Sequence, residues 1–240
     1  MPDGAQSGRG RLIGSRHSRR TRLTDCDVHG PASGAELLVV EGDSAALAVL
    51  KVRDPRLQAV LPMQGKPLNA LRASDGKVAA NPFLRALAEA IGAGRGAAFD
   101  PGALRYERIV LLMDPDADGI HAGALLLLFL YRWMPLLVER GHVERVHAPM
   151  GELRSAHGEP RYAYTDPQFR ALGAELRAAE QGPYTALRYR GLAGLDSGVL
   201  AEQCVHPATR RGRILTPDDA RAAMDVFASL RDLPPQGSLF

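Results

Sequence analysis

The sequence predicts an α/β protein: a parallel β-sheet with flanking helices, followed by a smaller α+β region. Short apolar runs end abruptly in acidic residues, and segments of helix-forming composition follow them. In addition, the run at 108–113 is apolar almost throughout. Such a run is typical of a strand buried on both faces, as in a parallel sheet. We therefore expect helices on both sides of the sheet.

The first half of the predicted core alternates strands with helices, judged from apolar runs and from helical composition or spacing. We expect strands at 36–40 and 58–61 and helices at 45–50 and 82–91. Ser44 is a suitable N-cap for the first of these helices. Pro62 follows the second strand, and we expect it to stop that strand because proline lacks an N–H group.

A long apolar helix is expected to follow the strand at 108–113. It begins near residue 120, and Gly141 is placed to close it. Its apolar run is interrupted by Arg132 and Pro135 and is shorter than the roughly 20 residues that a membrane-spanning helix needs. We therefore expect a buried helix and no membrane partner.

The texture of the sequence changes after residue 150. The patterns predict strands at 143–147, 161–165 and 185–189 and helices at 167–180 and 217–230. We divide the chain into a flexible basic arm at 1–34, a core at 35–150 and a tail region at 151–240. The arm superficially resembles a mitochondrial transit peptide, but a disordered arm is the simpler interpretation of its Gly-, Ser- and Arg-rich composition.

Composition narrows the partners and the compartment. The net charge of +3 and the pI of about 9.1 favour a polyanionic partner only mildly. Aromatic residues make up 5%, which argues against a single-strand binder built on stacking platforms. Cys26 and Cys204 form neither a disulfide framework nor a spaced metal set, so a reduced, cytoplasmic compartment fits them.

Four acidic side chains follow two of the predicted strands. Glu41 ends the first strand, and Asp114, Asp116 and Asp118 follow the strand at 108–113. Ligands of open α/β sheets lie beyond the carboxyl ends of the strands, so neighbouring strands would bring these carboxylates together. Crowded carboxylates raise each other's pKa, and a hard divalent cation such as Mg²⁺ relieves the repulsion through oxygen ligands.

Other interpretations of the same residues stay open. Asp118 before Gly119 is equally suited to cap the following helix. The spacing loosely resembles a calcium loop, but Leu125 stands where the loop needs glutamate. His121, in the first turns of the helix, is more readily a packed or capping histidine than a metal ligand.

A strand ending in Glu-Gly, followed by a strand ending in Asp-x-Asp, resembles the Toprim fold, a Rossmann-like parallel sheet found in topoisomerases, primases and some nucleases. Further motifs in the same order resemble the B subunit of type IIA DNA topoisomerases, that is, of DNA gyrase and topoisomerase IV. These motifs lie at 41–45, 62–69, 114–121 and 188–192. The likeness runs from about residue 23 to residue 232 and covers the Toprim and C-terminal parts of that subunit.

The resemblance implies a mechanism. Mg²⁺, or Mn²⁺ as a substitute, would be held by Glu41, Asp114 and Asp116, with Asp118 assisting, and would stabilise charge on a DNA phosphodiester during cleavage and rejoining. Glu41 would also relay a proton to the leaving sugar oxygen. Phosphate contacts are implied for Lys51, Arg53, Lys66, Arg190 and Arg210, although each alone is equally well a solvated charge. Lys66 and Arg190 are favoured because they lie inside motifs.

The chain also departs from the family pattern. Ala46 and Leu47 replace a glycine pair, and a leucine there could crowd DNA. Leu50 replaces a lysine and Ile120 a serine, and residues 193–195 replace a Gly-Glu-Met element. The sequence before residue 35 is too short for an ATPase domain, so we expect no ATP-driven strand passage by this chain alone. A separate ATPase chain is then a candidate partner.

Three hypotheses follow. In the first, the chain is a Mg²⁺- and double-stranded-DNA-binding subunit. It then acts as an isomerase only with a tyrosine-bearing A-type partner, either gyrase A or topoisomerase IV A. In the second, the chain is a catalytically degenerate decoy or regulator of a topoisomerase. In the third, it is a stand-alone Toprim nuclease or primase, for which the motif at 188–192 would have no purpose.

Overall fold

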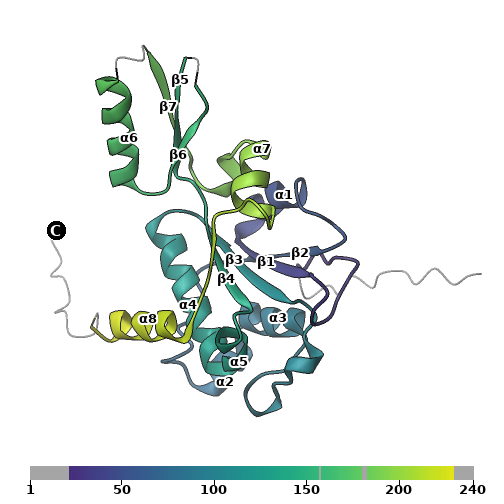
Figure 1. Ribbon diagram of the computed structural model, residues 1–240. Helices are drawn as coiled ribbons and strands as arrows, with labels where there is room; N and C mark the ends of the chain where they lie inside the picture. Colours follow the sequence, from purple (N-terminus) through teal and green to yellow (C-terminus); the bar gives the residue numbers. More distant parts are fainter. Residues whose placement is uncertain (1–21, 157, 180–182, 230–240) are drawn as a thin grey trace, which may run out of the picture.

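The computed structural model describes residues 22–156, 158–179 and 183–229. Most of the predicted N-terminal arm, residues 1–21, lies outside this part of the chain. A larger sheet with helices on both faces forms the base of the molecule in Figure 1, and a smaller sheet with one helix stands above it. The predicted α/β class with a parallel sheet is confirmed.

The larger sheet has the strand order β2-β1-β3-β4-β8. Its first four strands are parallel and β8 is antiparallel to β4. The bounds are β1 Glu36–Glu41, β2 Gln58–Met63, β3 Arg108–Met113, β4 Val143–His147 and β8 Gly212–Ile214. β2 runs through Pro62, where we expected it to stop. β2 is the outer strand beside β1, and a proline is tolerated in an edge strand because one side needs no N–H.

Alternate side chains of β1 enter two separate cores. Leu37 and Val39 pack in the larger cluster together with residues of α3 (Pro82–Ile91) and α4 (Ala117–Trp133). Leu38 and Val40 pack on the other face, with α1 (Gly42–Leu50) and the segment around residues 192–205. Because both faces are covered, the central strands are apolar in nearly every position.

Two predicted helix boundaries were wrong. α1 begins at Gly42, so Ser44 lies inside the first turn and does not cap the helix. The long apolar helix ends at Trp133 and a short α5 (Pro135–Glu139) follows, so Gly141 does not close it. Proline is unfavourable in the middle of a helix and restricts the residue before it, which accounts for the break at Met134.

The chain leaves the larger sheet after β4 and later returns to it. β5 (Gly151–Ser155), β6 (Arg161–Ala163) and β7 (Tyr184–Arg188) form the smaller sheet, in the order β6-β5-β7, beside α6 (Asp166–Ala178). Beyond β7, short helical turns at 192–194, 197–200 and 201–205 pack on the larger sheet, and β8 joins it. α8 (Pro217–Ser229) then packs against α4.

The remaining elements lie between β2 and β3. They are α2 (Asp75–Ala80) and 3-10 turns at Gly96–Ala98 and Pro101–Ala103. The sequence did not predict α2, β5 or β8, because each is short and shows no clear periodicity of apolar residues. In the described part of the chain, no helix combines the length and apolar character needed to cross a membrane.

Candidate metal centre

The acidic residues lie where the strand order of the sheet reverses. From β1 the chain crosses to β2 on one side, and from β3 it crosses to β4 on the other. β1 and β3 are neighbours, with Val40 paired to Leu112, so Glu41 is level with Met113 and Asp114 lies one residue beyond. Such a point in an open parallel sheet is the usual place for a ligand.

Glu41 carries a buried carboxylate oxygen without a partner. Its Oε2 atom makes no hydrogen bond to any described residue. Burial raises the pKa of Glu41, and the charges of Asp114, Asp116 and Asp118 raise it further, while Lys66 opposes them. An unsatisfied buried oxygen among carboxylates is unfavourable alone and fits a bound cation.

Asp114 is half-buried and is held by the chain segment that follows β7. Its Oδ1 accepts a hydrogen bond from the Leu192 amide at 2.8 Å. Burial raises the pKa of Asp114 above its ordinary value, and Asp116 adds to this, whereas the Leu192 hydrogen bond lowers it. The position of Asp114 therefore depends on residues far from it in sequence.

Asp116 and Asp118 each have a partner of their own. Asp116 is the N-cap of α4, and its Oδ1 accepts from the Gly119 amide at 2.8 Å. The cap role that we considered for Asp118 is therefore wrong. Asp118 pairs with Lys66 at 2.7 Å, and this hydrogen bond lowers the pKa of Asp118.

Two of the predicted DNA-contacting cations lie beside the acidic residues. Lys66 follows β2 at the same sheet edge and pairs with Asp118. Arg190 is exposed and lines a cavity of about 690 Å³, together with Asp114, Asp116 and Ile120. We call the end of the sheet that carries Glu41, Asp114, Asp116 and Asp118 the acidic edge. The cavity lies between this edge and the start of α6. Positive and negative groups there face one open space, as a site for a phosphate backbone and its cation requires.

The other predicted cations are not part of this arrangement. Lys51 is the C-cap residue of α1, at the opposite end of that helix from Glu41. Arg53 lies close to it, and its guanidinium donates to the backbone carbonyls of Asp25 and Gln58. The phosphate contacts implied for Lys51 and Arg53 would therefore have to lie away from the acidic edge.

Arg210 has a structural role and not the implied phosphate contact. It is buried and donates to both Glu36 on β1 and Glu144 on β4. A further bond goes to the Val205 carbonyl, so all three nitrogens of the guanidinium are used. A buried Arg with two carboxylates cannot turn out to meet DNA without leaving both charges unpaired.

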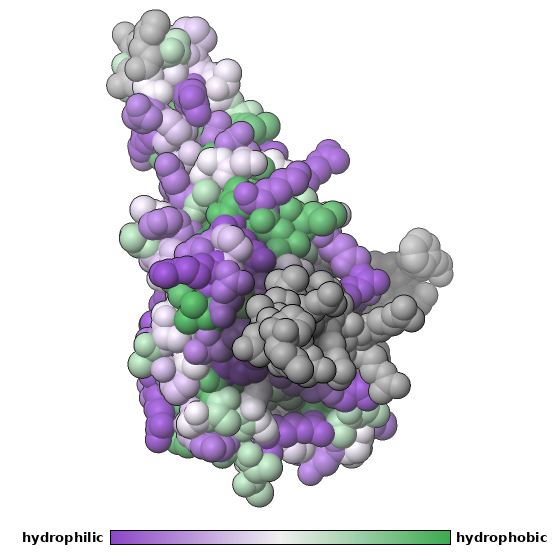
Figure 2. Space-filling model, turned by 90° about the vertical axis from the view of Figure 1, so that its right-hand side faces the viewer, coloured by the Kyte–Doolittle hydropathy of each residue, from purple (hydrophilic) through white to green (hydrophobic). Residues whose placement is uncertain are grey.

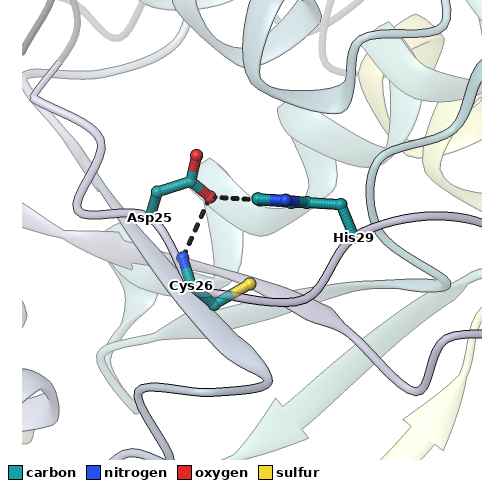
Figure 3. Close-up of side chains that lie close together, drawn as sticks. All are labelled: Asp25, Cys26 and His29. Atoms are coloured by element: carbon teal, nitrogen blue, oxygen red, sulfur yellow. Dashed lines mark hydrogen bonds and ion pairs between the residues drawn. The ribbon is translucent and has the colours of Figure 1, made fainter. Parts of the chain in front are cut away.

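A second cluster of metal-ligand side chains lies near the start of β3. Asp25, Cys26 and His29 lie close together (Figure 3), and one ligand atom from each lies within 4.8 Å of the others. Within the described residues no such group forms at the acidic edge, where Asp116 and Asp118 bind the Gly119 amide and Lys66. Mg²⁺ uses few direct protein ligands and several waters, so a looser set still suits it.

The Asp25 cluster is better explained as a hydrogen-bonded anchor. Tyr106 and Arg105 both donate to Asp25, and Arg105 also contacts His29 at 3.1 Å. The guanidinium thus stands where a cation would have to bind. Burial, and then Asp25, raise the pKa of Cys26, whose thiol donates to the Val28 carbonyl at 3.1 Å. A neutral thiol is a poor metal ligand.

His121 contacts the last helix, α8. Its ring is 5.3 Å from that of Phe227 on α8, at a tilted angle. This contact agrees with the packed histidine that we favoured over a metal ligand.

Comparison with known proteins identifies the larger domain. Residues 36–148 match the Toprim domain family. The chain contains a Toprim domain. It is also 39% identical over 212 residues to the DNA gyrase B subunit of Mycolicibacterium smegmatis, and 38% identical over 213 residues to that of Thermus thermophilus. The gyrase B protein of Mycobacterium tuberculosis is 39% identical over 215 residues.

These matches cover 87% of this chain but only 31% to 33% of the relatives. The chain thus spans about a third of the length of the curated relatives it matches. The likeness to the type IIA B subunit, first seen in the motifs, is confirmed by the identity along most of the chain.

The sequence did not indicate two features of the structure. One is the hydrogen bond from Leu192 to Asp114, although the motif at 188–192 had been singled out. The other is the anchor around Asp25, for which the spacing Asp-Cys-x-x-His was the available signal.

Proposed function

We propose that this Toprim chain is the Mg²⁺-dependent, DNA-binding part of a type IIA topoisomerase. It supports cleavage and religation of double-stranded DNA together with a tyrosine-bearing A-type partner. The observation that carries this proposal is the unpartnered buried oxygen of Glu41, beside Asp114 at the switch point of the sheet. The similarity to proteins named as B subunits of DNA gyrase supports it.

Glu41, Asp114 and Asp116 would hold the cation, and Asp118 would assist from its pair with Lys66. A bound Mg²⁺ would supply charge stabilisation for a phosphodiester during its cleavage and rejoining. Mn²⁺ would substitute, because it accepts the same oxygen ligands. Glu41 would also relay a proton to the leaving sugar oxygen.

Lys66 and Arg190 would hold the DNA backbone on either side of the acidic edge. Phosphate contacts of this kind provide affinity without reading the base sequence. The attacking tyrosine would come from gyrase A or topoisomerase IV A. We place this activity in the cytoplasm, where the two buried, unpaired cysteines would stay reduced.

The direct test is the formation of cleaved DNA complexes. The chain is mixed with a gyrase A protein, supercoiled DNA and Mg²⁺, and protein-linked DNA ends are counted after denaturation. We expect links with the wild-type chain and none with Glu41→Gln or Asp114→Asn. Glu89→Gln, an exposed residue of α3 paired with Arg85, is the matched control and should retain them. Absence of links with every A-type partner would reject the proposal, and nicking by the chain alone would favour a nuclease.

One observation favours a second candidate, a decoy or regulator of a topoisomerase. Leu47 on α1 is 62% exposed, where the family pattern has glycine. Figure 2 shows apolar surface gathered at the middle of the face that carries α1 and α7. Ala46, by contrast, is buried and does not obstruct this surface. A decoy would inhibit supercoiling when titrated into an active gyrase, and Leu47→Gly would weaken that inhibition.

A further inference from the structure

The segment after β7 returns to the main sheet and contacts the Asp114 carboxylate. The Leu192 amide donates to Asp114 Oδ1 at 2.8 Å. The side chain of Leu192 is fully buried in the core cluster that contains Leu38 and Leu112. The donor is thus a backbone group fixed to the core, and its direction does not depend on a mobile side chain.

Gly191 makes this close approach possible. Its φ is +85°, a region that residues with a side chain rarely adopt. A Cβ atom at this position would lie 2.5 Å from Asp114 Oδ2 and 2.8 Å from its Cγ. Such distances are shorter than any ordinary contact, so a side chain here would push the carboxylate or the loop aside.

We infer that Gly191 and the Leu192 amide are positioning elements, which hold the Asp114 carboxylate in place for the divalent cation. This inference rests on the proposed function and adds a role for a motif outside the sequence of the Toprim domain. A metal ligand must be ionised and correctly oriented when the cation arrives. The Leu192 hydrogen bond fixes the direction of the Asp114 carboxylate, and Gly191 leaves the room that this approach needs.

The arrangement also couples the two parts of the chain. Arg190, on the other side of Gly191, lines the cavity beside Asp116. A phosphate bound by Arg190 would therefore be held by the same short loop that orients Asp114. DNA contact and cation binding would then depend on one backbone conformation.

The experiment measures Mn²⁺ binding by the electron paramagnetic resonance of the free ion, without DNA or an A-type partner. Groups that orient metal ligands typically change metal affinity by about 10- to 100-fold. We expect Gly191→Ala to weaken binding at least about tenfold. Two controls share one property each with Gly191. Gly34 has a positive φ of +75°, as Gly191 does, but no atom lies within 4 Å of a Cβ placed there. Gly194 lies in the same loop as Gly191, and a Cβ placed there also has no atom within 4 Å.

Gly34→Ala and Gly194→Ala should bind Mn²⁺ as the wild-type chain does. If Gly191→Ala binds as the controls do, the inference is overturned, while the proposed function stands. Asp114→Asn is the reference that separates the two. If the wild type takes up no Mn²⁺, or Asp114→Asn binds it equally well, both ideas are overturned.

A second measurement applies if Gly191→Ala folds poorly. The NMR chemical shift of the Leu192 amide proton is compared between the wild type and Asp114→Asn. It should lie further upfield in the variant, because an amide oxygen is a weaker hydrogen-bond acceptor than a carboxylate. The Leu195 amide, whose partner is the Leu192 carbonyl, is the internal reference and should stay in place. A Leu192 resonance that does not move overturns the inference.

Discussion

Arg210 and Glu36 are 174 residues apart in sequence, yet the Nη2 atom of Arg210 lies 2.7 Å from the Oε1 atom of Glu36 in the buried interior. The same guanidinium donates to Glu144 on β4. These bonds attach the returning C-terminal segment to β1 and β4. Glu41 and Asp114 follow strands of the same sheet, so the ion pairs of Arg210 support the geometry of the acidic site.

Arg210→Met should destabilise the fold strongly. It leaves Glu36 and Glu144 buried without a counter-charge, and breaking a buried pair typically costs about 3–5 kcal/mol. Urea unfolding followed by circular dichroism measures the change. Arg213→Ala, which removes a more exposed partner of Asp219, should cost about 1 kcal/mol or less. Equal effects of the two substitutions would contradict the structural role of Arg210.

Asp116 should show two separable roles. Asp116→Asn keeps a side-chain oxygen for the Gly119 amide and so should keep the cap of α4, because asparagine is as good an N-cap as aspartate. Asp116→Ala should lose about 0.5–2 kcal/mol of stability. Both variants remove the charge and should weaken Mn²⁺ binding alike. Metal binding that follows stability in the two variants would show that Asp116 acts only as a cap.

Lys66→Ala should weaken DNA binding in a salt-dependent way. Its ion pair with Asp118 is exposed, so the fold should change by no more than about 1 kcal/mol. A lost phosphate contact reduces the slope of log K against log salt by about 0.9. Fluorescence anisotropy with a DNA duplex over a range of salt measures this slope. Lys77 is exposed on α2, and Lys77→Ala should leave this slope unchanged. An equal decrease of the slope in both variants would mean that the protein attracts DNA only through its overall positive charge.

The anchor around Asp25 should make stability depend on acid pH. Partial burial raises the pKa of Asp25, but hydrogen bonds from His29, Tyr106 and Arg105 outweigh it and lower the pKa to about 2. Because the folded value lies below the ordinary 3.8, this contribution is complete above that pH and is lost as the pH falls toward 2.

The measurement compares wild type with Asp25→Asn in urea at several pH values. The stability difference should be largest near neutral pH and should shrink below about pH 4, as the wild-type carboxylate takes up a proton. A difference that stays constant from neutral to acid pH would show that Asp25 keeps an ordinary pKa.

The strands and the acidic edge could be predicted from sequence because their causes are local. A strand buried on both faces must be apolar in nearly every position, as at 108–113, and its end must be marked by polar residues. Glu41 then lies beside Asp114 because β1 and β3 are parallel neighbours, a pairing that the sequence left as a condition and the structure shows. The boundaries were less certain where two signals competed, as at Met134, where Pro135 ended a helix whose apolar character continued.

The parts that the sequence did not reveal depend on contacts between distant residues. Arg210 resembles a surface cation until its two buried carboxylate partners are known. Asp116 and Asp118 are both suited to cap α4, and only the backbone geometry decides that Asp116 does so. In the same way, Gly191 is a simple turn residue in sequence, and its contact with Asp114 emerges only from the fold.

The central claim is that Glu41 and Asp114 gather one divalent cation at the edge of the sheet. Isothermal titration of Mn²⁺ into the wild-type chain, and into Glu41→Gln, tests it most directly. We expect one binding event for the wild type and a loss of at least about tenfold in affinity for Glu41→Gln, since a charged ligand is removed. No heat of binding in the wild type, or equal binding in both proteins, would contradict the account.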